Sequence, residues 1–316
     1  MKVVFHYSSG PILSAELDSL SEQGLFVTQI PVDDKVGFEQ AMREVEVLWH
    51  VLEPISKEHI CMAPNLKLIQ KIGVGVNTID ITAAEENGIA VCNMPGKNSQ
   101  AVAEMTLLLM LASLRQASYF DSRTRQGLGW DVSPNIQDSL GEIHGKTVGF
   151  IGFGEIPQRL APILKAMGAR IIYNSTTEKV TSLGEFQGFE EVCRTADILS
   201  LHIPLTVETA NLIDASVFIE MKQGSVLVNT SRGGVIDQGA LIDALKLGPL
   251  SAAGLDVYAE EPIHLDDPIL KLKNVMLTPH VAWLTRETLN RSIALAVENC
   301  VRLRDKQDLL YQVSNN

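Results

Sequence analysis

The fold is decided by the stretch Thr147-Val148-Gly149-Phe150-Ile151-Gly152-Phe153-Gly154-Glu155-Ile156-Pro157. Its first five residues are mostly β-branched or aromatic and predict a strand, and the glycines after them predict a tight turn into a helix. The helix continues through Leu160 and Leu164 at helical spacing and ends at Gly168. This order is typical of a site where backbone amides at a helix N-terminus bind a dinucleotide pyrophosphate. We therefore predict cofactor contacts at Gly152, Gly154, Glu155 and Ile156.

A proline stands where the third glycine of this fingerprint is usual. Pro157 lacks an amide hydrogen, but in the first helical turn that hydrogen has no intrahelical partner, so we expect the helix to form. The third glycine normally permits close packing of the helix on its strand. Pro157 therefore leaves two outcomes open: close packing, or a displaced helix with a weakened cofactor site.

The residues after the next predicted strand bear on the choice of nicotinamide coenzyme. An acid about 20 residues past the glycines normally accepts hydrogen bonds from the adenosine ribose. This chain instead has Tyr173-Asn174-Ser175-Thr176-Thr177, with Lys179 nearby. Because no carboxylate repels a 2′-phosphate and several hydroxyls can donate to one, NADP is favoured, with contacts from Asn174, Ser175 and Thr176. Since no arginine is present, NAD and a merely solvated polar loop remain the alternatives.

Strand and helix patterns alternate along the whole chain. Before the glycine turn, apolar runs predict strands at 2–5, 45–49, 66–72 and 89–92. From the turn's own strand onward, six strands are predicted, at 147–151, 170–173, 197–201, 225–229, 251–257 and 275–277. An almost uniformly apolar helix is expected from Ser99 to about Ala117, and a last helix from Arg286 to Arg304. The alternation indicates an α/β fold, and six strands fit a doubly wound parallel sheet that binds a nucleotide.

Length, charge and cysteine content exclude several classes of protein. At roughly 150 residues per domain, 316 residues predict two domains. Twenty-six basic and 38 acidic residues give a net charge of −12, which disfavours nucleic acid and anionic membranes as partners. The four cysteines form no C-x-x-C pair, so we expect no structural metal and a reducing, cytoplasmic compartment. The longest apolar run, Met105 to Leu114, is too short to span a bilayer.

Three predicted strands in the second half each lead directly into charged or titratable residues. These segments are Asn229-Thr230-Ser231-Arg232-Gly233-Gly234, Asp256-Val257-Tyr258-Ala259-Glu260-Glu261-Pro262 and Leu277-Thr278-Pro279-His280. In open α/β sheets, ligands bind beyond the carboxyl ends of the strands. We therefore expect these side chains to converge on one site.

With these segments in this order, the sequence resembles the D-isomer-specific 2-hydroxyacid dehydrogenase family. Two further motifs carry the resemblance, Gly73-Val74-Gly75-Val76-Asn77-Thr78-Ile79-Asp80 and Asn98-Ser99-Gln100-Ala101-Val102-Ala103-Glu104. The resemblance covers nearly the whole chain. It implies two Rossmann-like domains, with the dinucleotide-binding domain (99–285) inserted into a flavodoxin-like substrate-binding domain (1–98 and 286–316).

The resemblance also implies a catalytic triad. His280 would be the general acid that protonates the carbonyl oxygen of the substrate, since imidazole titrates near neutral pH. Glu261 would hydrogen-bond the other ring nitrogen and fix the tautomer. Arg232 would hold a 2-keto acid through its carboxylate and carbonyl oxygens, because its planar guanidinium forms paired hydrogen bonds. Taken singly, each of these residues has a structural or solvent-exposed alternative.

Further site residues follow from the same resemblance. Backbone amides near Val74 and Gly75 would bind the substrate carboxylate, and Asp256 would contact the nicotinamide carboxamide. Other expected substrate contacts are Asn77, Leu52 and Trp283, and other expected cofactor contacts are Ile203, Pro204, Thr209 and Thr230. The pair Ala282-Trp283 resembles the Ala-Trp pair that glycerate dehydrogenases and hydroxypyruvate reductases carry at this position. A packing role for the indole would explain Trp283 equally well. The loop Trp49–Pro54 contains no lysine or arginine, which disfavours a phosphorylated substrate.

These features predict an NAD(P)H-dependent reductase of a small unphosphorylated 2-keto acid, with glyoxylate and hydroxypyruvate as first candidates. By resemblance it would be a homodimer. One rival is a nicotinamide-sensing, corepressor-like protein without catalytic activity, since such proteins share the fold and the triad positions. The other is a dehydrogenase of a compact inorganic or one-carbon anion. Family enzymes that act on formate carry glutamine where Glu261 stands, so Glu261 disfavours formate and leaves phosphite open.

Overall fold

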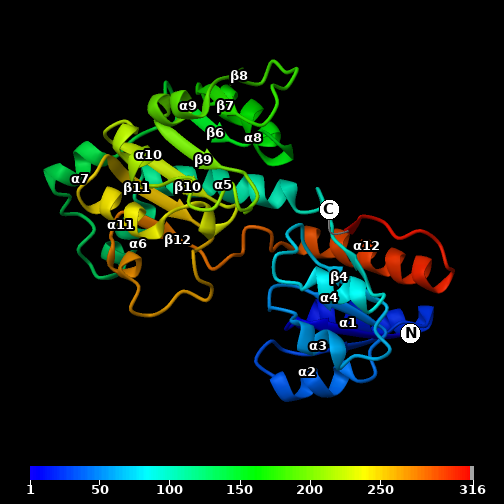
Figure 1. Cartoon of the computed structure of the whole chain (residues 1–316). Helices are drawn as coiled ribbons and strands as arrows, with labels where there is room; N and C mark the ends of the chain where they lie inside the picture. Colours follow the sequence, from blue (N-terminus) through cyan, green and yellow to red (C-terminus); the bar gives the residue numbers. More distant parts are fainter. Residues whose placement is uncertain (314–316) are drawn as a thin grey trace. The chain divides into compact units, whose positions relative to one another are not determined.

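The computed structural model describes residues 1–313 and divides the chain into two compact units (Figure 1). The first unit comprises Met1–Asn98 and the described residues from Thr285 on, and the second comprises Ser99–Leu284. The second boundary falls one residue before the position expected from the sequence. Each unit is an α/β sandwich built around its own parallel sheet.

The first unit has the strand order of the flavodoxin-like fold. Within the described residues its sheet runs β13-β5-β4-β3-β1-β2. The five strands β1 to β5 pair in parallel, in the doubly wound order 2-1-3-4-5, and β13 adds an antiparallel edge. Their bounds are β1 Lys2–His6, β2 Phe26–Gln29, β3 Val47–His50, β4 Leu68–Lys71, β5 Ala90–Cys92 and β13 Gln312–Val313.

Helices flank this sheet, and some of them bury apolar residues in one core cluster with its strands. They are α1 Pro11–Ser19, the short 3-10 helix η1 Leu20–Gln23, α2 Lys35–Met42, α3 Lys57–Cys61, α4 Ile81–Glu86 and α12 Arg286–Arg304. The last helix has the predicted bounds and belongs to the first unit, as expected. Strand β2 and helix α2 were not predicted. β2 is an edge strand with no buried residue, and α2 buries only Phe38 and Met42, so neither carries a strong apolar pattern.

The second unit has the strand order of a dinucleotide-binding fold. Its sheet runs β12-β11-β10-β9-β6-β7-β8, with every pair parallel. The bounds are β6 Thr147–Ile151, β7 Arg170–Asn174, β8 Glu185–Phe186, β9 Ile198–Leu201, β10 Ser225–Asn229, β11 Leu250–Leu255 and β12 Val275–Leu277. Counted along the chain this is the order 3-2-1-4-5-6-7, the doubly wound arrangement with one added edge strand. The predicted count of six lacked β8, which has two exposed residues and no apolar pattern.

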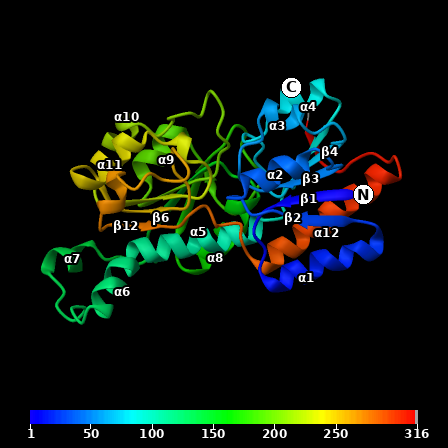
Figure 2. The same cartoon turned by 90° about the horizontal axis from the view of Figure 1, so that it is seen from below.

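The helices of the second unit lie on both faces of its sheet. They are α5 Ser99–Leu114, α6 Ala117–Arg125, α7 Pro134–Ser139, α8 Glu155–Ala166, α9 Phe189–Thr195, α10 Ala215–Glu220, η2 Gly233–Val235, α11 Gln238–Lys246 and η3 Pro268–Lys271. Most of α5 is buried, as its composition predicted, and it packs on α8, β10 and β11. It ends earlier than expected because Gln116 adopts a left-handed conformation with φ of 46°. Figure 2 shows α6 and α7 beyond the end of α5.

Helix α8 packs closely on the sheet despite Pro157. The proline is buried in the first turn of the helix, where no intrahelical hydrogen bond is lost. Leu160, Ala161 and Leu164 are fully buried in the same core cluster as Phe150 of β6. Of the two outcomes that the sequence left open, the structure therefore has the closely packed helix.

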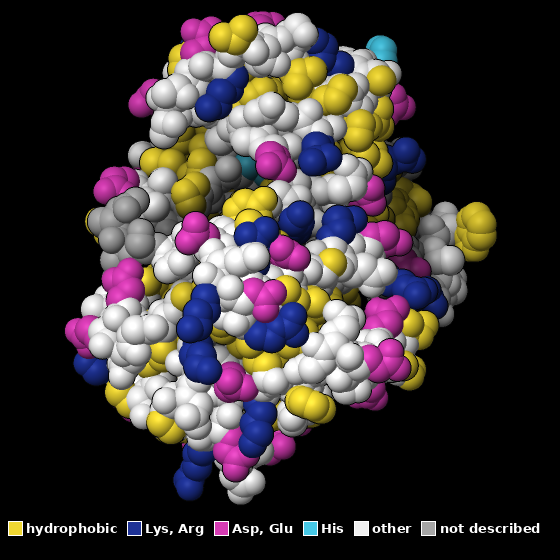
Figure 3. Space-filling model, turned by 90° about the vertical axis from the view of Figure 1, so that its right-hand side faces the viewer, with side chains coloured by type: hydrophobic (Ala, Val, Ile, Leu, Met, Phe, Trp, Pro, Cys, Tyr) yellow, Lys and Arg dark blue, Asp and Glu magenta, His cyan; other side chains and the backbone are white. Residues whose placement is uncertain are grey.

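The surface and the helices give two further observations. Among residues 1–313, no helix combines the length and apolar character needed to cross a membrane. Basic and acidic side chains are intermixed on the face drawn in Figure 3.

The buried side-chain amide of Asn299 links helix α12 to strand β4 and to the segment before β13, and its contribution to stability can be tested. The Asn299 side chain of α12 donates to Gln70 Oε1 (2.6 Å) and to the Leu310 carbonyl (3.0 Å), and accepts from the Leu310 amide (2.8 Å). Asn299→Ala leaves these groups unpaired and should lower the free energy of unfolding by about 2–4 kcal/mol. Asn290→Ala, exposed on the same helix, should change it by less than about 0.5 kcal/mol. Urea unfolding would measure both; equal effects would contradict this account.

Candidate active site

The loop after β10 is shaped by a buried asparagine. Asn229 accepts hydrogen bonds from the amide and the hydroxyl of Ser231 (2.9 and 2.8 Å), and its own amide donates to the Arg232 carbonyl (2.9 Å). A Cβ on the next residue, Gly233, would collide with the carbonyl of Tyr258, so only glycine fits there. These contacts fix the backbone at Arg232 and hold this loop against the loop that follows β11.

The loop after β12 is held by the carboxylate of Asp256, at the end of β11. This carboxylate is 1% exposed and accepts from the Thr278 hydroxyl (2.6 Å) and from the amides of Val281 (2.9 Å) and Ala282 (2.8 Å). Burial raises the pKa of Asp256, and these hydrogen bonds only partly oppose the shift. The observed contacts of Asp256 position the segment that carries His280. The expected contact with a nicotinamide carboxamide stays a prediction.

His280 and Glu261 form a short hydrogen-bonded pair. The Nδ1 atom of His280 lies 2.6 Å from Oε2 of Glu261, and the other carboxylate oxygen accepts from the Tyr258 amide (2.9 Å). His280 has φ of 54°, a left-handed conformation that costs about 1–3 kcal/mol in a non-glycine residue and that occurs often at active sites. Trp283 donates from its indole nitrogen to the His280 carbonyl (3.1 Å). With Nδ1 engaged, Nε2 is the ring atom that can exchange a proton with a substrate.

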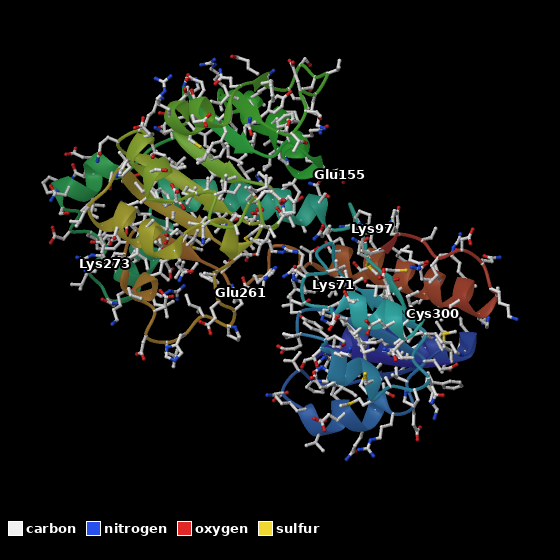
Figure 4. All side chains as sticks on the ribbon, viewed as in Figure 1. Lys71, Lys97, Glu155, Glu261, Lys273 and Cys300 are labelled. Carbon is white, nitrogen blue, oxygen red and sulfur yellow. The ribbon has the colours of Figure 1, made fainter. Side chains whose placement is uncertain are left out.

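The charges of Arg232, Glu261 and His280 act on one another. Burial acts to raise the pKa of Glu261, but the hydrogen bond and charge of His280, the Tyr258 amide and the Arg232 guanidinium outweigh it, so the pKa is lowered. Burial lowers the pKa of Arg232, against the opposing charge of Glu261. The Arg232 guanidinium also donates to the Ser231 carbonyl (2.6 Å). The structure thus brings the three predicted catalytic residues together; Figure 4 labels Glu261 in its loop.

The glycine turn has the geometry that a dinucleotide requires. Gly152 has φ of +89°, and a Cβ there would collide with the carbonyl of His202, so this position needs glycine. Gly154 is the N-cap of α8 without a side-chain cap, and a Cβ on it would meet no described atom within 4 Å. The first amides of α8 are therefore open to a phosphate. Glu155 accepts from the Ser99 hydroxyl (3.0 Å), a contact that sequence reasoning missed; Figure 4 labels Glu155 at the start of the helix.

The polar residues after β7 are partly engaged with one another. The Asn174 amide donates to the Gln187 carbonyl (3.0 Å), and the Ser175 hydroxyl donates to the Thr177 carbonyl (2.6 Å). Thr176 is exposed. The ammonium of Lys179 lies 3.2 Å from the Thr177 hydroxyl. Hydroxyls and an ammonium therefore lie together at the edge where the second strand of the nucleotide fold ends.

The other predicted cofactor residues lie in the loops after β9 and β10. Ile203 packs against the core and near Gly152, while the Thr209 hydroxyl donates to the Pro204 carbonyl (2.7 Å) and closes that loop. The hydroxyl of Thr230 lies 2.9 Å from that of Thr106. Thr106 was missed by the sequence reasoning, although a buried hydroxyl in the apolar α5 was a signal.

The predicted substrate residues of the first unit lie at the carboxyl ends of its strands. Val74, Gly75 and Asn77 belong to the loop between β4 and α4, and Leu52 to the loop after β3. The Val74 carbonyl accepts from the Asn93 amide (2.9 Å), which braces the first of these loops. Val74 and Leu52 are exposed, as residues that contact a ligand would have to be.

Comparison with known proteins shows the class of protein that this fold and site define. Residues 107–282 match the family model described as D-isomer specific 2-hydroxyacid dehydrogenase, NAD binding domain. The chain is 42% identical to the glyoxylate reductase of Aeropyrum pernix over 267 residues, covering 82% of this chain and 80% of that protein. It is 36% identical to the glyoxylate reductase of Korarchaeum cryptofilum over 296 residues, covering 92% and 89%. The chain belongs to the D-isomer specific 2-hydroxyacid dehydrogenase family and is an NAD(P)H-dependent oxidoreductase.

Solved structures agree on the fold. The protein TT0316 from Thermus thermophilus matches with a TM-score of 0.89 and 34% identity, over 99% of this chain and all of that one. An acyclic imino acid reductase in complex with NADPH and D-Arg matches with 0.83 and 28%, over 99% and 100%. A formate dehydrogenase from Staphylococcus aureus in complex with NAD matches with 0.89 and 26%, over 100% of both chains. Neighbours of this fold therefore use either nicotinamide coenzyme.

The two glycines of the turn should separate folding from coenzyme binding. Gly152→Ala forces a Cβ against the His202 carbonyl at a positive φ and should lower stability by more than about 2 kcal/mol. Gly154→Ala has space and an ordinary backbone (φ −83°), so it should fold normally while binding NADH or NADPH at least about tenfold more weakly, because its methyl faces the phosphate site. Thermal unfolding and coenzyme fluorescence measure the two effects. Unchanged coenzyme affinity in Gly154→Ala would contradict this placement.

His202 should make stability depend on pH. Burial lowers its pKa from 6.5 to about 3, and its Nε2 lies 2.9 Å from the Ser200 hydroxyl. As the pH falls, His202 becomes protonated in the unfolded chain before it does in the folded protein. Its contribution to the free energy of unfolding is therefore fully present above pH 6.5 and declines as the pH falls toward 3, by about 2 kcal/mol at pH 5. His202→Gln should lose that part of the decline, whereas exposed His264→Gln should keep it. Urea unfolding at pH 7.5 and 5 tests this; the same decline in His202→Gln and the parent would refute it.

Proposed function

We propose that this protein reduces a small, unphosphorylated 2-keto acid to the D-2-hydroxyacid, with glyoxylate and hydroxypyruvate as the first candidate substrates. The observation that carries the proposal is the 2.6 Å hydrogen bond between His280 and Glu261, in electrostatic contact with the half-buried Arg232. A paired acid and a guanidinium are the groups needed to protonate a carbonyl oxygen and to bind a carboxylate. Similarity to glyoxylate reductases supports the choice of substrate.

The residues of the second unit would act as follows. A bound nicotinamide coenzyme supplies the hydride. Glu261 holds Nδ1 of His280, so that Nε2 carries the proton that passes to the carbonyl oxygen. Arg232 binds the carboxylate and the carbonyl oxygen through paired hydrogen bonds, and its burial strengthens them because little water competes. Asp256 keeps His280 in place through the backbone of residues 281 and 282.

We assign the remaining residues to two functions. The second unit would be the dinucleotide-binding domain, with phosphate contacts from the turn at Gly152–Ile156 and contacts from Thr209 and Thr230. The first unit would be the substrate-binding domain, with carboxylate contacts from the amides near Val74 and Gly75. Asn77, Leu52 and Trp283 would bound the rest of the substrate.

We favour NADP over NAD as the coenzyme. The support is the polar edge after β7, where Ser175, Thr176 and Lys179 provide hydroxyls and an ammonium. Residues 174–177 include no acid, and the first carboxylate after the strand is that of Glu178. A 2′-phosphate would be stabilised there by hydrogen bonds and by the opposite charge.

We also infer a homodimer, as the family resemblance implies, and a cytoplasmic location, which the four free cysteines support. A sensing protein without activity is not favoured, since the compared relatives are reductases and dehydrogenases.

One titration tests the proposed function. The purified protein is titrated with NADPH and with NADH by fluorescence, and glyoxylate, hydroxypyruvate or pyruvate is then added while the absorbance of the reduced coenzyme is followed. We expect binding of both coenzymes, tighter for NADPH, and loss of absorbance with at least one keto acid. Coenzyme binding with no turnover of any keto acid would refute the reductase and favour a sensing protein.

Variants of the three catalytic residues test their roles. His280→Ala should lower kcat by about 10²–10⁴-fold, the usual contribution of a general acid, and Glu261→Gln should lower it less. Arg232→Ala should raise KM for the keto acid and also lower kcat, since this side chain would bind both the substrate carboxylate and the carbonyl oxygen that gains charge during reduction. His264→Ala and Arg194→Ala are matched controls, because both side chains are exposed in the same unit. Parent turnover in His280→Ala or Arg232→Ala would overturn the assignments.

A further inference from the structure

Lys71 is a buried lysine at the carboxyl end of a strand in the first unit. It is the last residue of β4, is 5% exposed, and lies beside His50 in the register of β3 and β4. Figure 4 labels it in that unit. Burying an ammonium is costly because the protein interior solvates charge poorly, so buried lysines commonly serve a specific purpose.

The side chain of Lys71 lies between two loops. Its ammonium donates to the carbonyl of Val51, in the loop that follows β3. Its Cε atom lies 3.3 Å from the point that a Cβ on Gly73 would occupy, so its methylene groups pass against the start of the loop that follows β4. Leu52 comes directly after Val51, and Val74 and Gly75 come directly after Gly73. Lys71 therefore contacts both loops in which the first unit would bind substrate.

The basic neighbours of Lys71 on the adjacent strands are uncharged. Burial lowers the pKa of His50 well below its usual range, and the charge of Lys71 adds to this effect. His50 donates from Nε2 to the Glu53 carbonyl (2.5 Å), in the same loop as Val51. Burial also lowers the pKa of His6, which pairs with His50 in the register of β1 and β3. Near neutral pH the His50 imidazole holds the loop through its hydrogen bond to Glu53, and neither imidazole contributes positive charge.

This contact changes the conclusion drawn from the sequence of the loop. Residues 49–54 themselves contain no lysine or arginine, so the sequence indicated no positive charge beside this loop. In the structure, the ammonium of Lys71, at the end of the neighbouring strand β4, contacts this loop at the Val51 carbonyl. The positive charge lies inside the protein and not on the loop surface, so it is poorly placed to contact a substrate phosphate directly. It is better placed to orient the two loops and to make their backbone amides more attractive to a carboxylate.

We propose that Lys71 is a positioning residue for the substrate carboxylate. Its hydrogen bond to Val51 sets the loop that carries Leu52, and its charge, beneath the turn at Gly73, raises the positive potential at the amides of Val74 and Gly75. This inference rests on the proposed function, in which those amides bind a carboxylate. A merely structural lysine would support the fold equally for every substrate, whereas a positioning cation favours anionic substrates over neutral ones.

Steady-state kinetics with a charged and an uncharged substrate separate the two roles. Lys71→Met removes both the charge and the hydrogen bond, Lys71→Gln removes the charge but keeps a donor for Val51, and Lys71→Arg keeps the charge. We expect kcat/KM for pyruvate to fall at least tenfold in the Met and Gln variants, mainly through KM, and to fall less than threefold for methyl pyruvate. Lys71→Arg should stay within about threefold of the parent, and coenzyme affinity should not change.

Lys67→Met is the matched control, since Lys67 is exposed just before the same strand and pairs with Glu46. It should leave both substrates unaffected. Equal losses for pyruvate and methyl pyruvate in Lys71→Gln, or no loss for either, would overturn the proposal. If Lys71→Met does not fold, Lys71→Gln decides alone.

A binding measurement keeps this test separate from that of the proposed function. Oxalate is titrated calorimetrically into the parent and into Lys71→Gln, each saturated with NADPH. At least tenfold weaker oxalate binding in the variant supports the role of Lys71 even if the parent turns over no keto acid, an outcome that would refute only the proposed function. Equal oxalate affinity in the two proteins, or no oxalate binding by the parent, would refute the role of Lys71.

Discussion

The candidate site depends on the buried carboxylate of Asp256. It stands at the end of β11 and accepts three hydrogen bonds from the segment that follows β12, each worth about 1.5–3 kcal/mol because the acceptor is charged. These bonds hold the backbone on both sides of His280 and sustain its left-handed conformation. The imidazole is thereby directed at Glu261, whose carboxylate in turn accepts from the backbone of the loop after β11. Without Asp256, His280 would lose the backbone contacts that hold it in position.

The topology of the sheet explains why these groups meet. Strands β10, β11 and β12 are parallel neighbours, so their carboxyl ends lie at one edge and deliver three loops to the same place. Gly233 allows two of these loops to touch, because any side chain there would collide with Tyr258. The same edge, two strands further on, carries the glycine turn after β6. The proposed coenzyme phosphate site and the proposed proton donor therefore belong to one edge of one sheet.

The sequence was sufficient for much of the fold, and it supplied the candidate site residues that the structure places in neighbouring loops. The six longer strands of the second unit and the helix Arg286–Arg304 carry strong apolar patterns and formed as predicted. Strand β8 and helix α2 were missed because the first has no buried residue and the second has two, so tertiary contacts and not local patterns establish them. The close packing of α8 depends on how the buried face of that helix fits against β6. The glycine motif alone does not specify this fit, so the effect of Pro157 could not be predicted from it.

Long-range side-chain contacts were the least predictable part of the site. The contact of Lys71 with Val51 spans 20 residues and joins a strand to a loop that has no lysine or arginine of its own. The pairing of Thr106 with Thr230 spans 124 residues. Such contacts follow from the register of neighbouring strands and from helix packing, and the sequence specifies these only through the complete fold. The motifs thus supplied the candidate site residues, while the structure identified the contacts that hold those residues in place.

We propose that Arg232, His280 and Glu261 form one site for a 2-keto acid beside the coenzyme. A crystal structure with bound NADPH and oxalate tests it most directly. We expect coenzyme phosphates at the amides of Gly152–Ile156 and an oxalate carboxylate on the Arg232 guanidinium. Nε2 of His280 should lie within hydrogen-bond distance of oxalate while Nδ1 stays on Glu261. Oxalate bound away from Arg232, or His280 turned away from Glu261 in the complex, would contradict it.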